Sequence, residues 1–114
     1  MAKKSIDREE VGRINGEIME VIQKYIEKIS QYYKVEAIIL FGSYAKGTEN
    51  EDSDIDIAVI SEDFEDIYDS MAILMGMTWD IDARIEPHPI TVEDYENIAT
   101  PFVKEVIDTG IKVA

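Results

Sequence analysis

The sequence contains no cysteine, which excludes disulfide bonds and thiolate metal sites. It also lacks an apolar run of the roughly 20 residues that a membrane span requires. The first residues, Met1 to Ser5, lead into a polar segment instead of the apolar core of a signal peptide. These absences predict a cytoplasmic protein without a membrane partner.

Basic residues are scarce, with 11 Lys and Arg against 25 Asp and Glu, which gives a formal net charge of −14. Between residues 48 and 77 there are ten acidic residues and no Lys or Arg. Non-specific binding of nucleic acid depends on basic surface that releases counterions. A long polynucleotide is therefore not expected as the sole partner, whereas a small nucleotide delivered with Mg²⁺ is compatible with this charge.

Hydrophobic periodicity along the 114 residues predicts a single α/β domain, 1–114, with a small sheet packed by helices. A long N-terminal helix is expected over 5–33, a core over 36–86 and a helical tail over 91–114. Within the core the expected elements are an apolar strand at 36–41, an alternating strand at 54–60, a helix at 63–77 and a strand at 79–86. Pro87 and Pro89 are expected to end that last strand.

The stretch from Phe41 to Ile60 concentrates the chemistry. Gly42 permits close approach of the backbone to a ligand, and Ser43 supplies a hydroxyl at the expected start of a short helix, a place that favours anions. Asp54 and Asp56 alternate with apolar residues, so both carboxylates lie on one face of a strand. Such oxygen ligands suit Mg²⁺, which completes its shell with substrate phosphates. The stretch therefore predicts a phosphate site beside a metal site.

A third carboxylate is expected from the strand at 79–86. Asp82 is preferred to Asp80 because it lies deeper in that strand. Together with Asp54 and Asp56 it would form a site for two metal ions, as used for in-line displacement at phosphorus. Arg84 is interpreted as a partner of Asp82 or Glu86.

Several other residues have ordinary structural interpretations. His88, the sole histidine, is interpreted as a loop residue with no second metal-ligand candidate nearby. Lys46 is as compatible with a solvated loop lysine as with a phosphate contact. The position of Tyr44 beside the phosphate site leaves open a contact with a bound base.

Gly42-Ser43, ten residues and then Asp54-Ile55-Asp56 match the GS-x10-DxD signature, and the chain resembles the minimal nucleotidyltransferases of the DNA polymerase beta-like superfamily. The resemblance implies the palm-like nucleotidyltransferase fold with a small mixed sheet. It implies that Gly42 and Ser43 bind the nucleotide phosphates, that Asp54, Asp56 and Asp82 form the catalytic metal site for Mg²⁺, and that ATP is the donor. It further implies a HEPN-domain partner in a toxin–antitoxin pair, whose tyrosine some relatives adenylylate.

The resulting hypothesis is an Mg²⁺-dependent nucleotidyltransferase that transfers AMP from ATP to a hydroxyl. The residues outside the core are too few for a second domain that could hold the acceptor, so the acceptor is expected on a partner chain or across a homo-oligomer. One alternative is a non-catalytic antitoxin that masks its partner. Another is a transferase acting on a small molecule such as an antibiotic.

Overall fold

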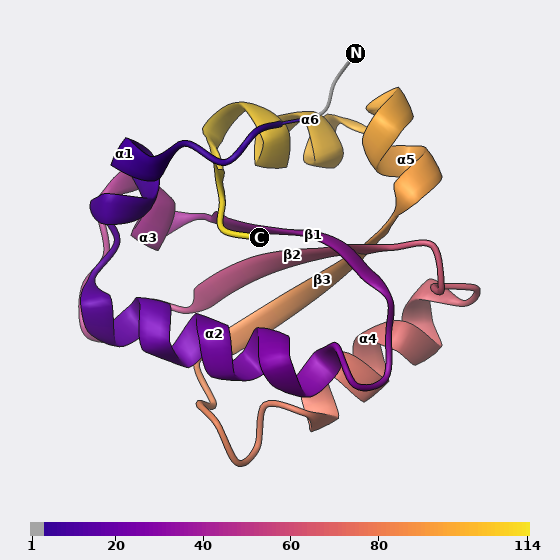
Figure 1. The fold of residues 1–114 in the computed structure, drawn as a ribbon, viewed down its shortest axis with the longest axis horizontal. Helices are drawn as coiled ribbons and strands as arrows, with labels where there is room; N and C mark the ends of the chain where they lie inside the picture. Colours follow the sequence, from indigo (N-terminus) through magenta and orange to yellow (C-terminus); the bar gives the residue numbers. More distant parts are fainter. Residues whose placement is uncertain (1–3) are drawn as a thin grey trace.

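A computed structural model describes residues 4–114 and forms a four-stranded mixed sheet with helices on both faces (Figure 1). The strand order is β3-β2-β1-β4. Strand β1 runs antiparallel to β2 and to β4, whereas β2 and β3 are parallel. The strands are β1 Val35–Phe41, β2 Ile55–Ser61, β3 Ile85–Thr91 and β4 Ile111–Lys112. This confirms the predicted α/β class with a small mixed sheet.

The two faces of the sheet carry separate clusters of buried side chains. Helices α2 (Gly16–Ile29) and α4 (Ile67–Gly76) cover one face, and α5 (Val92–Asn97) and α6 (Pro101–Thr109) cover the other (Figure 1). The apolar residues of β2 alternate between these clusters: Ile55, Ile57 and Val59 join the first, and Ala58 and Ile60 the second. Since side chains alternate along a strand, Asp56 lies on the α5/α6 face.

The predicted single helix over 5–33 is wrong, because the chain forms α1 (Arg8–Gly12) and α2 as separate helices. Asp7 caps α1 by accepting hydrogen bonds from two backbone N–H groups. Asn15 then caps α2 by accepting from the backbone N–H of Glu17 at 2.8 Å. A glycine at the end of α1 and another at the start of α2 weaken a continuous helix, and the asparagine provides a new start.

The predicted strand at 79–86 is also wrong. Residues 77–84 form turns, and β3 begins at Ile85 and continues through Pro87 and Pro89. Because β3 is an edge strand, its outer side needs no hydrogen-bond donors. The backbone carbonyl of Arg84 accepts from Ile55 of β2 at 2.8 Å, so even-numbered residues here direct their backbone towards β2 and the prolines direct theirs outward.

The helical tail predicted over 91–114 contains the two helices α5 and α6. Thr91 caps α5 through its side chain, and Pro101 opens α6, which ends before Gly110. Helix α4 starts later than predicted, with Asp66 as its cap. The short strand β4, which pairs with β1, has no clear sequence signal. Across the described residues no helix combines the length and the apolar character that crossing a bilayer demands.

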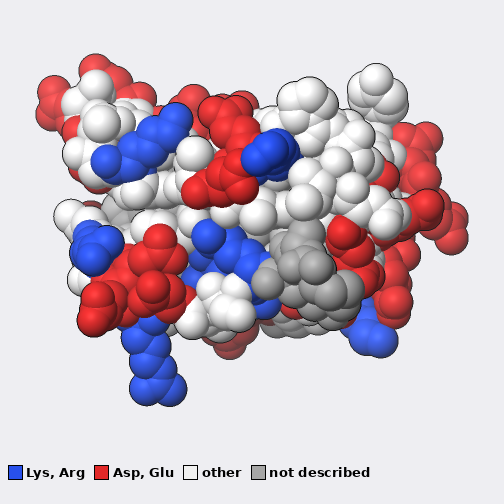
Figure 2. All heavy atoms as spheres, turned by 90° about the horizontal axis from the view of Figure 1, so that it is seen from above, with Lys and Arg blue, Asp and Glu red and all other residues white. Residues whose placement is uncertain are grey.

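Figure 2 shows the face of the molecule above α5 and α6, where acidic side chains form several separate groups with fewer basic side chains between them. Among the described residues visible on this face, the basic side chains form no continuous surface.

Candidate active site

The turn after β1 brings the backbone against the carboxylate of Asp56. Gly42 adopts φ 74° and ψ −153°, a conformation open essentially to glycine alone, and precedes α3 (Ser43–Lys46). A Cβ atom placed on Gly42 would overlap Oδ2 of Asp56. Glycine is therefore required here both for the turn and for the close approach. Ser43 is half-buried at the start of α3.

Asp56 occupies the centre of the site because its strand lies between β1 and β3. Its register partners are Phe41 on β1 and Glu86 on β3. Asp54 lies two residues earlier, immediately before β2, and is exposed. The predicted carboxylate pair is thus at the end of β2 that adjoins the Gly42 turn.

Two side chains of β3 complete this group: Glu86 and His88. Single ligand atoms of Asp56, Glu86 and His88 lie within 4.8 Å of one another. His88 Nε2 is 3.7 Å from Asp56 Oδ1 and 3.6 Å from Glu86 Oε1. The interpretation of His88 as a loop residue without neighbouring metal-ligand candidates is wrong, because the strand starts six residues later than expected and includes it.

The electrostatics of the group reflect crowded negative charge. Burial raises the pKa of Asp56, and the Asp54 carboxylate raises it further, while His88 opposes both effects. Burial also raises the pKa of Glu86, with further contributions from Asp54 and Asp56. Burial lowers the pKa of His88 despite the neighbouring Asp56. Carboxylates that raise one another's pKa in this way are relieved by a bound cation.

The structure places Asp82 away from this group. Its carboxylate accepts hydrogen bonds from the backbone N–H of Arg84 at 2.9 Å and from the guanidinium at 3.1 and 2.8 Å. This ion pair lowers the pKa of Asp82. Asp80 is highly exposed and pairs with Lys28. The predicted pairing of Arg84 with Asp82 is confirmed, and both candidate third carboxylates have basic partners.

Glu86 is the residue that the sequence reasoning missed. It belongs to the pattern Ile85-Glu86-Pro87-His88-Pro89-Ile90, which alternates with period two as a strand should. The two prolines led to the prediction that the strand ends before them. They are two residues apart, and that spacing suits an edge strand whose outer side lacks donors.

A groove of ≈ 360 Å³ adjoins the carboxylates on the β3 side. It is lined by Asp54 and Glu86 together with apolar and basic residues, namely Met71, Met75, Ala83, Arg84 and Ile85. A neighbouring pocket of ≈ 370 Å³ shares Met75 and Ala83 with it and extends to Trp79. The two form a continuous apolar surface that leads to the carboxylates.

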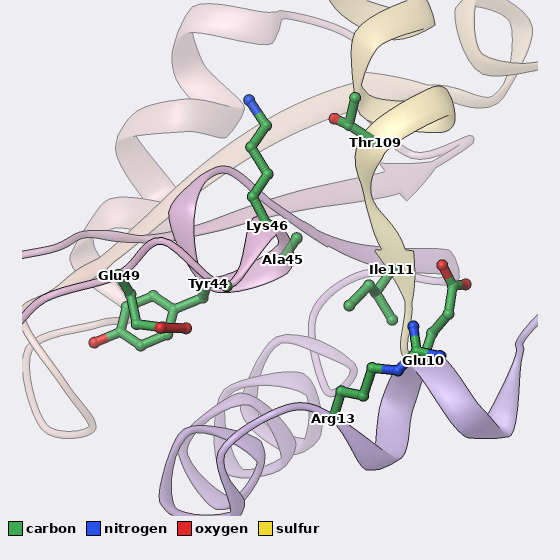
Figure 3. Close-up of a pocket in the computed structure, with 9 residues that line it drawn as sticks. Glu10, Arg13, Tyr44, Ala45, Lys46, Glu49, Thr109 and Ile111 are labelled. Carbon is green, nitrogen blue, oxygen red and sulfur yellow. The ribbon is translucent and has the colours of Figure 1, made fainter.

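A third pocket, of ≈ 230 Å³, lies beyond α3, between that helix, α1 and the end of α6 (Figure 3). Charges of both signs line it, including Glu10, Arg13, Lys46 and Glu49. None of the clustered carboxylates is among its lining residues. Lys46 also lies 4.0 Å from Glu105 of α6, so the lysine is not dedicated to the Gly42 turn.

The mixed sheet and the carboxylates beside its glycine turn are those of an enzyme that transfers nucleotidyl groups. Residues 20–114 match the family described as polymerase beta, nucleotidyltransferase, and the chain belongs to that family.

Relatives and solved structures agree with this assignment. The chain is 35% identical over 96 residues to "Putative protein adenylyltransferase MJ1379" of Methanocaldococcus jannaschii, covering 84% of this chain and 93% of the relative. It is 30% identical over 100 residues to "Putative protein adenylyltransferase MJ0141" of the same organism, covering 85% and 99%. A crystal structure of a toxin–antitoxin with AMP-PNP matches with a TM-score of 0.62 and 26% identity, covering 83% of this chain and 71% of that one.

Proposed function

We propose that this nucleotidyltransferase transfers AMP from ATP to a hydroxyl group on a partner protein, with Mg²⁺, as the antitoxin of a pair with a HEPN-domain toxin. The names of the relatives, protein adenylyltransferases, support the reaction. The structural neighbour, a toxin–antitoxin with an ATP analogue, supports the donor and the biological setting. The observation that carries the proposal is the clustering of Asp54, Asp56 and Glu86 beside the Gly42 turn.

Gly42 and Ser43 hold the phosphates of the donor in this proposal. Gly42 has no side chain to block a phosphate, and Ser43 offers a hydroxyl donor next to it. Both directly follow Phe41 of β1, the register partner of Asp56, so they lie on the β1 side of that carboxylate. The donor therefore enters from the β1 side.

Asp54, Asp56 and Glu86 form the metal site. We assign the third carboxylate to Glu86 instead of Asp82, because Glu86 is the register partner of Asp56 whereas Asp82 is held by Arg84. Oxygen-rich donor sets of this kind fit Mg²⁺. When bound there, Mg²⁺ neutralises phosphate charge and lowers the pKa of the attacking hydroxyl.

Glu86 lies on the acceptor side of the site. The groove that it shares with Asp54 opens beside β3, opposite the Gly42 turn. The acceptor oxygen attacks the α-phosphorus and its proton passes to the Glu86 carboxylate, which lines the groove. Pyrophosphate leaves with the electrons of the bond that breaks. Glu86 then returns the proton to solvent.

The acceptor is carried by a partner protein that docks on the apolar surface leading to this groove. Trp79 lines the pocket of ≈ 370 Å³ and is 85% exposed, an unusual state for a large aromatic side chain. Exposed aromatic residues next to a groove are typical anchors of protein interfaces. Continuity of the two pockets through Met75 and Ala83 connects this surface to the carboxylates.

The test uses the full chain, the protein encoded by the neighbouring gene and ATP labelled at the α-phosphate. We expect Mg²⁺-dependent label on the partner, lost when Asp54→Asn and Asp56→Asn are combined. Asp80→Asn is the matched control, because that exposed carboxylate pairs with Lys28 outside the site. Neutralisation of the toxin by the double variant, with no label from wild type, would instead support a masking antitoxin. Label on a small hydroxylated compound alone would contradict a protein acceptor.

A further inference from the structure

His88 lies beside the clustered carboxylates but has no role in the proposed reaction. Its Nε2 atom is buried, and no hydrogen-bond partner lies within 3.5 Å of it among residues 4–114. A buried ring nitrogen without a partner loses the hydrogen bonds that water would have supplied. A buried nitrogen of this kind is expected to have a ligand that replaces those hydrogen bonds.

The surroundings of His88 fix its ring in one place. The ring contacts Phe41 of β1 with centroids 5.1 Å apart and Phe102 of α6 with centroids 5.5 Å apart. Its register partner on β2 is Ala58, whose small side chain leaves room for the ring above the sheet. The two phenyl rings and the alanine hold the imidazole so that Nε2 lies next to Asp56 and Glu86.

The distances suit a shared ion better than direct hydrogen bonds. Nε2 lies 3.7 Å from Asp56 Oδ1 and 3.6 Å from Glu86 Oε1, beyond normal hydrogen-bond length for both. Two ligand atoms each about 2.1 Å from one ion are about 3.4 Å apart at a tetrahedral angle and about 3.0 Å apart at a right angle. A side-chain adjustment of a few tenths of an ångström would bring Nε2 into that range of each of the two carboxylate oxygens.

We propose that Nε2 of His88 joins Asp56 and Glu86 as a metal ligand, so that the site whose carboxylates hold Mg²⁺ also binds a divalent transition metal such as Co²⁺ or Zn²⁺ through this nitrogen. Imidazole nitrogen favours these ions, whereas Mg²⁺ prefers oxygen ligands only. The inference rests on the proposed function, because it uses the same carboxylates.

The sequence makes a direct test possible, because His88 is the only histidine in the chain. The untagged full-length protein, labelled with ¹⁵N, is titrated with MgCl₂, CoCl₂ or ZnCl₂ while the imidazole nitrogen resonances are followed by NMR. We expect Zn²⁺ to shift the Nε2 resonance and Co²⁺ to broaden it. We expect Mg²⁺ to leave it largely unchanged. Calorimetry of the same titrations gives the affinities.

Two variants separate the nitrogen from the packing. His88→Phe keeps an aromatic ring between Phe41 and Phe102 but removes the ligand, and we expect it to weaken Co²⁺ and Zn²⁺ binding by about 10-fold or more with little effect on Mg²⁺. Phe102→Leu disturbs the ring contacts but keeps the nitrogen, and we expect it to retain the metal preference. Thermal unfolding of both variants verifies that they fold.

The outcomes distinguish this inference from the proposed function. If Mg²⁺ binds and AMP is transferred but the imidazole resonances ignore Zn²⁺ and Co²⁺, His88 is not a ligand and the inference is overturned. Equal affinity of wild type and His88→Phe for Co²⁺ would overturn it as well. If wild type binds Zn²⁺ through His88 yet transfers no AMP to any partner, the inference stands and the proposed function fails.

Discussion

Asp56 lies between Gly42, in the turn after β1, and Glu86 of β3. The site needs the absence of a side chain at the first of these neighbours and a carboxylate at the second. Gly42 must lack a side chain, because the carboxylate takes that space. Glu86 must carry a carboxylate in a partly buried place close to Asp54 and Asp56, and burial together with these two neighbours raises its pKa. Changes at either residue are expected to affect stability and activity differently.

Gly42→Ala is expected to abolish transfer and to lower the free energy of unfolding by about 1–3 kcal/mol, since its backbone conformation is strained for any other residue. Gly47→Ala is the matched control. Gly47 also has positive φ, 73°, but nothing lies within 4 Å of a Cβ there. We expect the control to lose stability by about 1–2 kcal/mol and to keep its activity. Urea unfolding and the labelled-ATP assay measure both. Full activity of Gly42→Ala would contradict the role of the turn.

Glu86→Gln is expected to lower the transfer rate by about 100-fold or more, as for the loss of a positioned proton acceptor. Asp82→Asn is expected to leave that rate largely unchanged. Single-turnover kinetics with the partner protein measure the two variants side by side. The reverse result would restore Asp82 as the third carboxylate.

The same Glu86→Gln variant is expected to stabilise the metal-free protein at neutral pH. A pKa raised by folding means that the folded state binds the proton more strongly than the unfolded state. That contribution to stability is present below the ordinary glutamate pKa and is lost as pH rises through the raised value. Because the Glu86 side chain is 44% exposed, solvent screening limits the effect to about 1 kcal/mol or less. Unfolding in EDTA at pH 4.5 and 7.5 should show the variant gaining only at the higher pH.

At the scale of elements, the sequence predicted the secondary structure that neighbouring residues determine. It did not predict elements whose formation depends on where the segment lies in the folded protein. The Gly42-Ser43 turn, the alternation of β2 and the caps of α5 and α6 are determined by residues that are close in the sequence. Strand β3 is not, because prolines are compatible with a strand only at a sheet edge, and the edge is defined by distant segments. Because that strand begins six residues later than predicted, Glu86 and His88 lie beside Asp56, whereas Asp82 precedes the strand.

The contact between α6 and β1 gives a prediction at this scale. A Cβ on Gly110, which joins α6 to β4, would overlap the side chain of Ile39 and the backbone carbonyl of Val106. Gly110→Ala is expected to lower the free energy of unfolding by about 1–3 kcal/mol through overpacking. Gly16→Ala at the start of α2 has open space around it and is expected to add up to about 1 kcal/mol. Equal stability of the two variants in urea would contradict this packing.

At the scale of the whole molecule, the proposed donor and acceptor sides of the site lie on opposite sides of β2. The Gly42 turn belongs to the β1 side, and the groove with its apolar extension belongs to the β3 side. Such an arrangement lets a partner protein reach the carboxylates without crossing the phosphate site.

Trp79→Ala is expected to weaken the complex with the partner protein by about 10-fold or more, as for truncation of an interface anchor. Since Trp79 is 85% exposed, the free energy of unfolding should change by no more than about 0.5 kcal/mol. Tyr32→Ala removes a 66% exposed aromatic residue that lines none of the three pockets and is the matched control. Calorimetry with the partner measures both. Equal affinities would place the docking surface elsewhere.

The exposure of Trp79 has a practical consequence, because it is the only tryptophan in the chain. Indole fluorescence shifts to shorter wavelength when water is removed from around the ring. Excitation of tryptophan in this protein therefore reports from the wall of the apolar pocket alone, without an attached dye. With a partner protein engineered to lack tryptophan, the emission wavelength of Trp79 would follow binding and dissociation in real time.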